Sequence, residues 1–265
     1  MIIQVEDPVI EVHDLTVSYD KRPVLWDVDF TLPEGKMIGI IGPNGSGKTT
    51  LIKSVMGLVP SDSGFVKTFG KPLEEVRSRV SYVPQRGSVD WDFPASVMDV
   101  VLMGRYGKRG IFKRLSSEDR KIANESLDKV GLYEFRNRQI AQLSGGQQQR
   151  VFLARAIAQK ADLYLMDEPF VGVDAASEEA IIGLLRDMKA EGKTVIVVHH
   201  DLQSATDYFD WIVLLNTRLI ASGPANDVFT AKLLQEAYGG RLNLLSTIGD
   251  LLQQHQLPIR EKSKT

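Results

Sequence analysis

A short apolar run followed at once by a glycine-rich stretch is the feature of this chain that most restricts its fold. The run is MIGII at residues 37–41, and GPNGSGKT follows it at 42–49. Five consecutive apolar residues predict a strand that is buried on both faces of a parallel sheet. The next residues, KTTLIKSVMGL, are typical of a helix. This order of strand, loop and helix predicts an α/β fold.

The glycine-rich stretch matches the P-loop pattern of phosphate-binding proteins, and it lies between a strand and a helix as that pattern requires. Glycines let backbone N–H groups converge on phosphate oxygens, and the helix that follows turns its positive dipole end toward the anion. Lys48 is expected to neutralise the β- and γ-phosphates of ATP, and the hydroxyl of Thr49 to coordinate Mg²⁺. The alternative is a glycine-rich turn without a ligand, and the flanking strand and helix count against it. The candidate nucleotide-contacting residues are Gly42, Pro43, Asn44, Gly45, Ser46, Gly47, Lys48, Thr49 and Thr50.

The rest of the chain separates into strand-like and helix-like regions. Residues 9–19 and 24–32 are rich in β-branched residues and partly alternating, which predicts an antiparallel strand pair. Between 96 and 160 the pattern is helical with little strand signal, and Ser116 with Asp119 resembles a capping box. Helices are predicted to start near Ser96, Ser116 and Ser144 and to cover 48–58 and 175–191, and further strands to cover 80–84, 162–166, 194–198, 211–215 and 218–223.

The predicted strands are followed by polar residues with the chemistry that a nucleotide site needs. Asp167 and Glu168 follow an apolar strand, Gln85 follows VSYVP, and His200 follows TVIVV. In such a sheet, ligands bind beyond the carboxyl ends of the strands, where the P-loop also lies. We expect Asp167 in the Mg²⁺ shell and Glu168 as the general base for the attacking water. Gln85 is expected to bridge the magnesium or the water, and His200 to hydrogen-bond the γ-phosphate, with His199 as the adjacent competitor.

A second helix begins with residues that favour contact with an anion. Residues 143–158, LSGGQQQRVFLARAIA, open with a serine and two glycines before a helical run. Together with GPNGSGKT and the acidic pair after LYLM, this start makes the chain resemble the ATPase subunits of ABC transporters from about residue 9 to about residue 229. The resemblance implies a P-loop NTPase core of the RecA-like type, with an N-terminal antiparallel β-subdomain and an inserted α-helical subdomain.

The same resemblance assigns roles to further residues. It makes Gln85 the Q-loop residue, Asp174 the D-loop residue and His200 the switch histidine. It also matches Tyr19 to the aromatic that stacks on adenine. A core or sheet-edge tyrosine is the alternative there, because stacking contributes only ~1–3 kcal/mol and other residues can supply it. LSGGQ becomes the signature motif, and the residues expected to contact the γ-phosphate of ATP held on an opposing copy are Ser144, Gly145, Gly146 and Gln147.

The resemblance also divides the chain and implies its partners. Residues 1–95 and 161–240 are expected to form the nucleotide-binding core with the β-subdomain, 96–160 the helical subdomain, and 241–265 a tail without an assigned role. No run approaches the ~18 apolar residues needed to cross a bilayer, and the N-terminus lacks the pattern of an export signal. The expected partners are a second copy in a head-to-tail pair around ATP, separate integral membrane permease subunits and, indirectly, an extracytoplasmic metal-binding protein. The chain itself is expected at the cytoplasmic face of the cell membrane.

Residues 80–94, VSYVPQRGSVDWDFP, and the VMDVVLMGRYG that follows shortly after resemble the ATPases of importers for manganese, iron or zinc. The resemblance implies import of a divalent metal ion, with manganese favoured and zinc or iron as alternatives. Trp91 and Phe93 beside Asp90 and Asp92 would suit an apolar anchor with a charged rim against the permease. The alternative is that these aromatic side chains fold back into the core.

Composition and motifs weigh against other classes of function. The net charge of -2 does not favour a nucleic-acid partner, and residues 50–142 are too few for the long coiled coil of relatives that act on DNA or ribosomes. LSGGQ has no place in P-loop kinases or GTPases, and no NKxD-type motif is present. The absence of cysteine excludes disulfides and thiolate metal sites. An ABC ATPase that serves a different importer or an exporter stays open.

Overall fold

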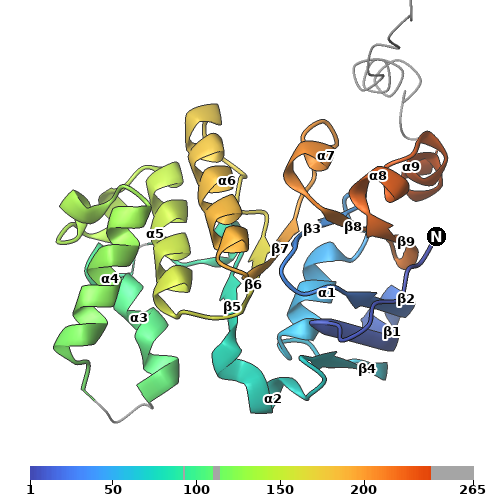
Figure 1. The fold of residues 1–265 in the computed structure, drawn as a ribbon, viewed down its shortest axis with the longest axis horizontal. Coiled ribbons are helices and arrows are strands. Elements are labelled where there is room, and N and C mark those ends of the chain that lie inside the picture. Colours follow the sequence, from blue (N-terminus) through green and yellow to red (C-terminus); the bar gives the residue numbers. More distant parts are fainter. Residues whose placement is uncertain (92, 110–113, 240–265) are drawn as a thin grey trace, which may run out of the picture.

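The computed structural model describes residues 1–91, 93–109 and 114–239, and it contains two sheets with helices between and around them (Figure 1). The smaller sheet has three antiparallel strands in the order β2-β1-β4. These are β1 (Ile10–Tyr19), β2 (Arg22–Leu32) and β4 (Ser63–Thr68). The predicted pairing of the first two is confirmed, with Ile10 opposite Leu32 and Tyr19 opposite Arg22. Strand β4 was not predicted from the sequence.

The larger sheet has six strands in the order β5-β6-β7-β3-β8-β9. The first five run parallel, and β9 pairs antiparallel with β8. Every residue of the three central strands β6, β7 and β3 is buried, as the apolar runs predicted. The strands are β3 (Met37–Ile41), β5 (Val80–Val83), β6 (Leu163–Asp167), β7 (Thr194–Val198), β8 (Trp211–Asn216) and β9 (Arg218–Pro224).

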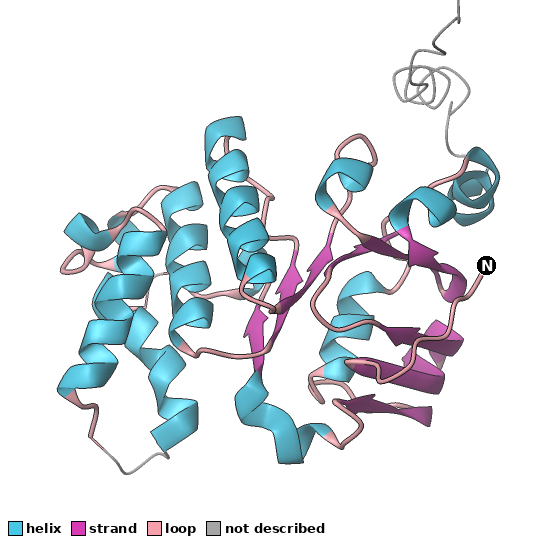
Figure 2. Ribbon diagram, viewed as in Figure 1, coloured by secondary structure: helices cyan, strands magenta, loops and turns pink. Residues whose placement is uncertain are grey.

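Successive residues of the central strands pack into two different cores. Val195 and Val197 of β7 face the core shared with the helices of one side, whereas Ile196 and Val198 face the core shared with the small sheet. Helix α1 (Lys48–Val55) lies between the two sheets, and its Leu51, Ile52 and Val55 belong to the second core. Figure 2 shows this helix enclosed by strands. The helix that follows the glycine-rich loop is therefore held from both sides.

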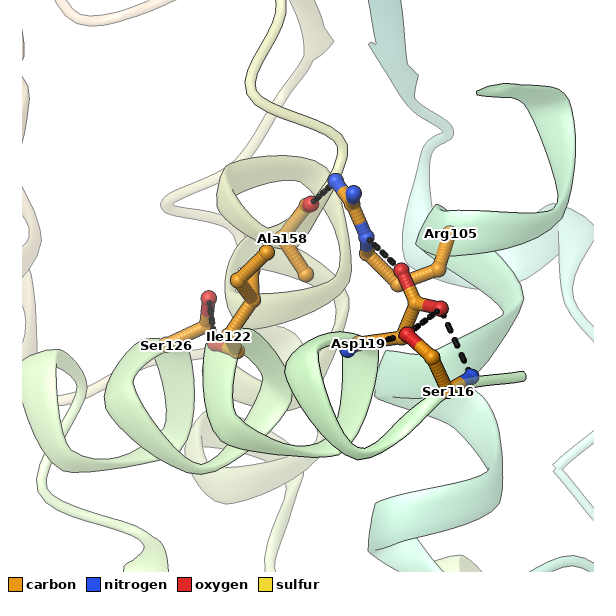
Figure 3. Close-up of polar contacts among 6 residues, drawn as sticks. All are labelled: Arg105, Ser116, Asp119, Ile122, Ser126 and Ala158. Carbon is orange, nitrogen blue, oxygen red and sulfur yellow. Dashed lines mark hydrogen bonds and ion pairs between the residues drawn. The ribbon is translucent and has the colours of Figure 1, made fainter. Parts of the chain in front are cut away.

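Three helices form a separate group beyond the β5 edge of the large sheet (Figure 1). They are α3 (Val97–Arg109), α4 (Ser117–Lys129) and α5 (Gly145–Ala158), close to the predicted starts. A buried ion pair joins them: Arg105 Nε donates to Asp119 Oδ1 at 3.1 Å, and its Nη1 donates to the Ala158 carbonyl at 2.6 Å. Asp119 also accepts from the backbone N–H of Ser116, which confirms the capping box (Figure 3). One carboxylate thus caps α4 and fixes it to its two neighbours.

The remaining helices connect these parts. They are α2 (Leu73–Val76), α6 (Ala175–Ala190), α7 (Ala205–Tyr208), α8 (Ala225–Val228) and α9 (Ala231–Tyr238), and short 3-10 turns cover Arg77–Arg79, Arg86–Ser88, Tyr133–Phe135 and Ile140–Gln142. Within the described residues, no helix is both long and apolar enough to span a bilayer. The predicted tail 241–265 and Asp92 lie outside the described residues. The predicted α/β class with an antiparallel β-part and a helical part is confirmed.

Candidate nucleotide site

The glycine-rich loop forms one wall of an open cavity at the start of α1. Gly47 caps the helix with a left-handed backbone, φ 99°, and a Cβ there would lie 2.6 Å from the Leu25 side chain and 2.8 Å from the Val24 carbonyl. Only glycine fits this position. Because Gly47 has no side chain, the first turn of α1 can pack closely against β2. The cavity has a volume of about 400 Å³ and is lined by Val24, Asn44, Gly45, Ser46, Gly47, Lys48, Thr49, Thr50, Gln85 and Glu168.

The ammonium group of Lys48 is held by the loop itself. Its Nζ donates to the carbonyls of Gly42 at 2.8 Å and Pro43 at 3.0 Å, and only 7% of the residue is exposed. Burial lowers the pKa of Lys48, while the negative charges of Glu168 and Asp167 oppose this shift. A poorly solvated cation next to a loop of backbone N–H groups favours an anionic ligand such as a phosphate.

Asp167, at the end of β6, is fully buried beside the first turn of α1. Thr49 Oγ1 donates to its Oδ1 at 3.0 Å, whereas its Oδ2 is buried and has no hydrogen-bond partner among the described residues. Burial raises the pKa of Asp167, and the bond from Thr49 opposes that rise. A carboxylate oxygen without a partner next to a hydroxyl matches the oxygen ligands that Mg²⁺ prefers. The residues present therefore fit the predicted ion.

Glu168 and Gln85 meet at the mouth of the same cavity. Gln85 Nε2 donates to Glu168 Oε2 at 2.5 Å. Glu168 has a left-handed backbone, φ 51°, which costs a residue with a Cβ of order 1 kcal/mol or more. Strain of this kind persists where the surrounding structure imposes it. In this conformation the carboxylate of Glu168 contacts the amide of Gln85 at the rim of the cavity. Two of the predicted catalytic side chains are thus brought together by strands β5 and β6.

The two histidines after β7 lie in different environments. His199 is 2% exposed and has its ring edge-on to Phe170 at 5.5 Å between centroids. Ser204 Oγ donates to Asp201 at 2.7 Å, so the same hydroxyl accepts from His199 Nε2 at 2.9 Å. His199 is therefore a satisfied core histidine, whereas His200 is exposed. Of the two, only His200 has a side chain available for a ligand.

The burial of His199 makes stability depend on pH. Burial lowers its pKa from 6.5 to about 4, so between these values the unfolded chain binds a proton that the folded chain does not. Acidification in that window therefore favours unfolding. We expect the free energy of unfolding to fall by about 2 kcal/mol from this group between pH 7 and pH 5, because each pKa unit corresponds to ~1.4 kcal/mol. Urea unfolding of the wild type and of His199→Phe at both pH values measures this difference.

The matched control for this experiment is His200→Phe, which changes an exposed ring. It should lose as much stability on acidification as the wild type, whereas His199→Phe should lose about 2 kcal/mol less. An equal loss in wild type and His199→Phe would contradict the assignment.

The signature residues lie apart from the cavity. Ser144 caps α5 by accepting from the Gln147 backbone N–H, and Gln147 Oε1 accepts from the Ser144 backbone N–H at 3.0 Å. Among the described residues, neither these two nor Gly145 and Gly146 line the cavity of the P-loop. The two helix starts that were predicted to contact an anion therefore do not share a cavity within one chain.

Two further predicted residues also lie outside the cavity lining. Asp174 caps α6 through Ser177, and the hydrogen bonds from Ser177 lower the pKa of Asp174. Tyr19, 45% exposed at the end of β1, has room for a stacking partner. Their predicted roles with ATP stay predictions.

The loop proposed to face a permease is partly folded back. Trp91 is half-buried, with its ring edge-on to Phe152 of α5 at 5.0 Å and its Nε1 donating to the Arg86 carbonyl at 2.9 Å. Phe93 is 54% exposed and is the aromatic residue of this loop that remains free for a partner. The alternative reading thus holds for Trp91, because the indole closes the loop against α5.

The structure adds two residues that the sequence analysis missed. Val24 lines the cavity from β2, and Arg86 reaches from the Q-loop to the start of α5, where its Nη2 donates to Gln148 Oε1 at 3.1 Å. Both contacts join segments far apart in the chain, so no local sequence pattern reports them.

Known proteins match this chain over most of its length. The ABC transporter family matches residues 25–171. The manganese transport system ATP-binding protein MntB of Bacillus subtilis (strain 168) is 61% identical over 236 residues, which cover 89% of this chain and 94% of that protein. The zinc transport system ATP-binding protein TroB of Treponema pallidum (strain Nichols) is 56% identical, over 88% of each chain. A solved inward-facing structure of a putative metal-chelate type ABC transporter has a TM-score of 0.77 and 28% identity, and covers 87% of this chain and 88% of the other.

Proposed function

The chain belongs to the ABC transporter family as an ATP-hydrolysing subunit, and from this premise we propose that it energises the import of a divalent metal ion. Manganese is the favoured cargo, with zinc or iron as alternatives. The observation that carries the proposal is the 61% identity, over nearly the whole chain, to a protein named for manganese transport. The 56% identity to a protein named for zinc transport supports the same class of cargo and keeps the choice of metal open.

ATP is proposed to bind in the 400 Å³ cavity with its phosphates against the N-terminus of α1. Lys48 would move its ammonium from the carbonyls of Gly42 and Pro43 to the β- and γ-phosphates, which compensate its charge better. The ring of Tyr19 would stack on adenine at the exposed end of β1. With its phosphates at α1 and its adenine at the end of β1, the nucleotide would lie across the junction of the two sheets.

Mg²⁺ is proposed to be held by Asp167, Thr49 and Gln85. The partnerless Oδ2 of Asp167 and the adjacent Thr49 hydroxyl support this ligand set. When bound with ATP, the ion would neutralise phosphate charge and orient the γ-phosphate.

For hydrolysis, Glu168 is proposed to accept a proton from the water that attacks the γ-phosphate. The bond from Gln85 leaves the other carboxylate oxygen of Glu168 to meet that water at the cavity rim. His200 would donate a hydrogen bond to the γ-phosphate as charge develops on its oxygens. The products are ADP and inorganic phosphate.

A complete site is proposed to need a second copy of the chain. The start of α5 has the chemistry of an anion site but lies outside the cavity of its own chain, among the described residues. In a head-to-tail pair, the residues 144–147 of each copy would close the ATP site of the other, with Asp174 near the junction. Binding of two ATP molecules would then draw the copies together, and hydrolysis would release them.

The pair is proposed to work at the cytoplasmic face of the cell membrane, on permease subunits that receive metal from an extracytoplasmic binding protein. A groove of about 540 Å³ between α2, α3 and the end of α1 supports a docking place, because Leu58 and Met103 in its lining are 52% and 41% exposed. Phe93, which precedes α3 in the chain, offers a further exposed apolar side chain. Purification of the chain from membranes should recover an integral membrane protein with it.

Uptake of radiolabelled metal tests the choice of cargo. In a strain that lacks the gene, manganese uptake should fall, and the wild-type gene should restore it while a Glu168→Gln gene should not. Parallel measurements with zinc and iron identify either metal as the cargo if its uptake, and not that of manganese, follows the gene. Unchanged uptake of all three metals would contradict metal import and favour a different importer or an exporter.

A further inference from the structure

Arg86 occupies a junction between the catalytic carboxylate and the signature helix of the same chain. It directly follows Gln85, which donates to Glu168, and its own guanidinium lies over the first residue of α5. A Cβ at Gly145 would lie 3.0–3.1 Å from the Arg86 Cζ, Nη1 and Nη2 atoms. The backbone at Gly145 does not need a positive φ. The absence of a side chain there therefore makes room for this guanidinium as well as for a phosphate.

The loop that carries Arg86 is fastened to α5 at two places. The first is the helix start, where Arg86 Nη2 donates to Gln148 Oε1 at 3.1 Å. The second lies further along the helix, where Trp91 packs on Phe152 and donates to the Arg86 carbonyl. The loop and the helix are therefore in contact both at the start of α5 and at Phe152, one turn further along it.

The loop is also fastened to the ATP cavity. Gln85 reaches Glu168 at 2.5 Å, and a Cβ at Gly172, shortly after Glu168, would lie 3.8 Å from Arg86 Nη1. The contacts run without a gap from the cavity rim to the start of α5.

The guanidinium is bonded to Gln148 but is not fully satisfied in this position. Its Nε is buried and has no hydrogen-bond partner among the described residues. A positive charge beside the positive end of a helix dipole is also unfavourable. A shift of Arg86 when Gln85 changes partner would therefore break the hydrogen bond to Gln148 but relieve these two unfavourable features.

From this geometry we propose that Arg86 is a positioning residue that couples the two ATP sites of the pair. The proposal rests on the head-to-tail arrangement of the proposed function. Gln85 senses the nucleotide in the cavity of its own chain, whereas the start of α5 serves the cavity of the other copy. Arg86 joins the two within one chain, so occupancy of one site sets the position of the signature residues at the other.

Steady-state ATP hydrolysis by the full-length chain, with the membrane proteins that copurify with it, tests this coupling. In the wild type, two coupled sites give a Hill coefficient of about 2, and in Arg86→Ala the value should fall to about 1 with an ATP half-saturation raised about 5-fold or more. Arg86→Lys should behave like Arg86→Ala, because an ammonium lacks the planar fork that covers Gly145 and reaches Gln148. Arg120→Ala, which removes an exposed arginine from α4, is the matched control and should behave like the wild type.

Two further measurements separate coupling from other roles. ATP binding to the isolated chain under conditions where it is monomeric should be unchanged in Arg86→Ala, because this residue does not line the cavity. A weakened monomer affinity would overturn the proposal by placing Arg86 at its own site. A Hill coefficient that stays at about 2 in Arg86→Ala, even if the melting temperature drops, would mean that Arg86 contributes to stability and not to coupling. If Arg86→Lys kept the Hill coefficient of the wild type, the positive charge at position 86, and not the planar guanidinium, would account for the effect of Arg86.

Failure of the proposed function would give a different result from failure of the coupling proposal. In that case the wild-type chain itself would show neither an ATP-dependent pair nor cooperative hydrolysis, whatever residue stands at 86. If the wild type is cooperative and the Arg86 variants are equally cooperative, the proposed head-to-tail pair is retained and the proposed coupling through Arg86 is rejected.

Discussion

Glu168→Gln should leave ATP binding intact while turnover falls about 100-fold or more, the lower range of what a positioned general base contributes. The substitution keeps the shape of the side chain but removes the oxygen that takes a proton from water. Because the strained backbone at Glu168 and the contact with Gln85 are imposed by strands β5 and β6, the glutamine should occupy the same place. ATP then stays unhydrolysed between two copies, so the variant should accumulate as a pair that forms only when ATP is present.

Size-exclusion chromatography with and without ATP, together with phosphate release, measures both effects. Glu118→Gln is the matched control, because it makes the same chemical change at an exposed position in the first turn of α4. It should hydrolyse ATP at the wild-type rate and should not accumulate as a pair. Hydrolysis by Glu168→Gln at the wild-type rate would remove Glu168 from its proposed role.

Lys48→Ala should weaken ATP binding about 10- to 100-fold, because hydrogen bonds to charged groups contribute ~1.5–3 kcal/mol and each ~1.4 kcal/mol is a factor of ten. The buried ammonium is poorly solvated in the free protein, so its removal costs the free state little charge stabilisation and costs the bound state its cation. Titration of the purified chain with a fluorescent ATP analogue measures the change in affinity.

The control for this variant is Lys71→Ala, an exposed lysine whose side chain is within reach of Glu75. Its ATP affinity should match that of the wild type. Thermal unfolding without nucleotide should accompany both variants, since Lys48 also satisfies two loop carbonyls whose loss could loosen the loop. Undiminished ATP affinity in a folded Lys48→Ala protein would contradict the proposed phosphate contact.

Local patterns predicted most of the elements that carry the site. The predicted strands at 37–41, 162–166 and 194–198 correspond to the three central strands, because a strand that is buried on both faces consists mainly of apolar residues. The helix start at 116 was visible because a capping serine and its partner three residues later lie within one turn, and the start at 144 because a serine and two glycines precede a helical run. Strand β4 was not predicted because three of its six residues are exposed and its sequence, SGFVKT, lacks the apolar alternation on which strand prediction relies.

The site was predictable in its residue types and less so in its geometry. The sequence named Asp167 and Glu168 as a pair, but the different surroundings of the two carboxylates, one fully buried against Thr49 and one at the cavity rim with Gln85, come from the packing of β6 against α1 and β5. His199 and His200 were competitors in the sequence. The structure distinguishes them, because the core around Phe170 and Ser204 encloses His199 and leaves His200 exposed.

By itself, the sequence determined the α/β class, the phosphate loop, the two anion-directed helix starts and the acidic pair, because each depends on residues that are neighbours in the chain. The tertiary structure alone decided that the second helix start lies outside the cavity of its own chain, that Trp91 closes its loop against α5, and that Arg86 joins Gln85 to Gly145. These contacts connect residues separated by about sixty positions, and no local periodicity encodes them. Only the packing of the helical group against the β5 edge of the large sheet brings them together.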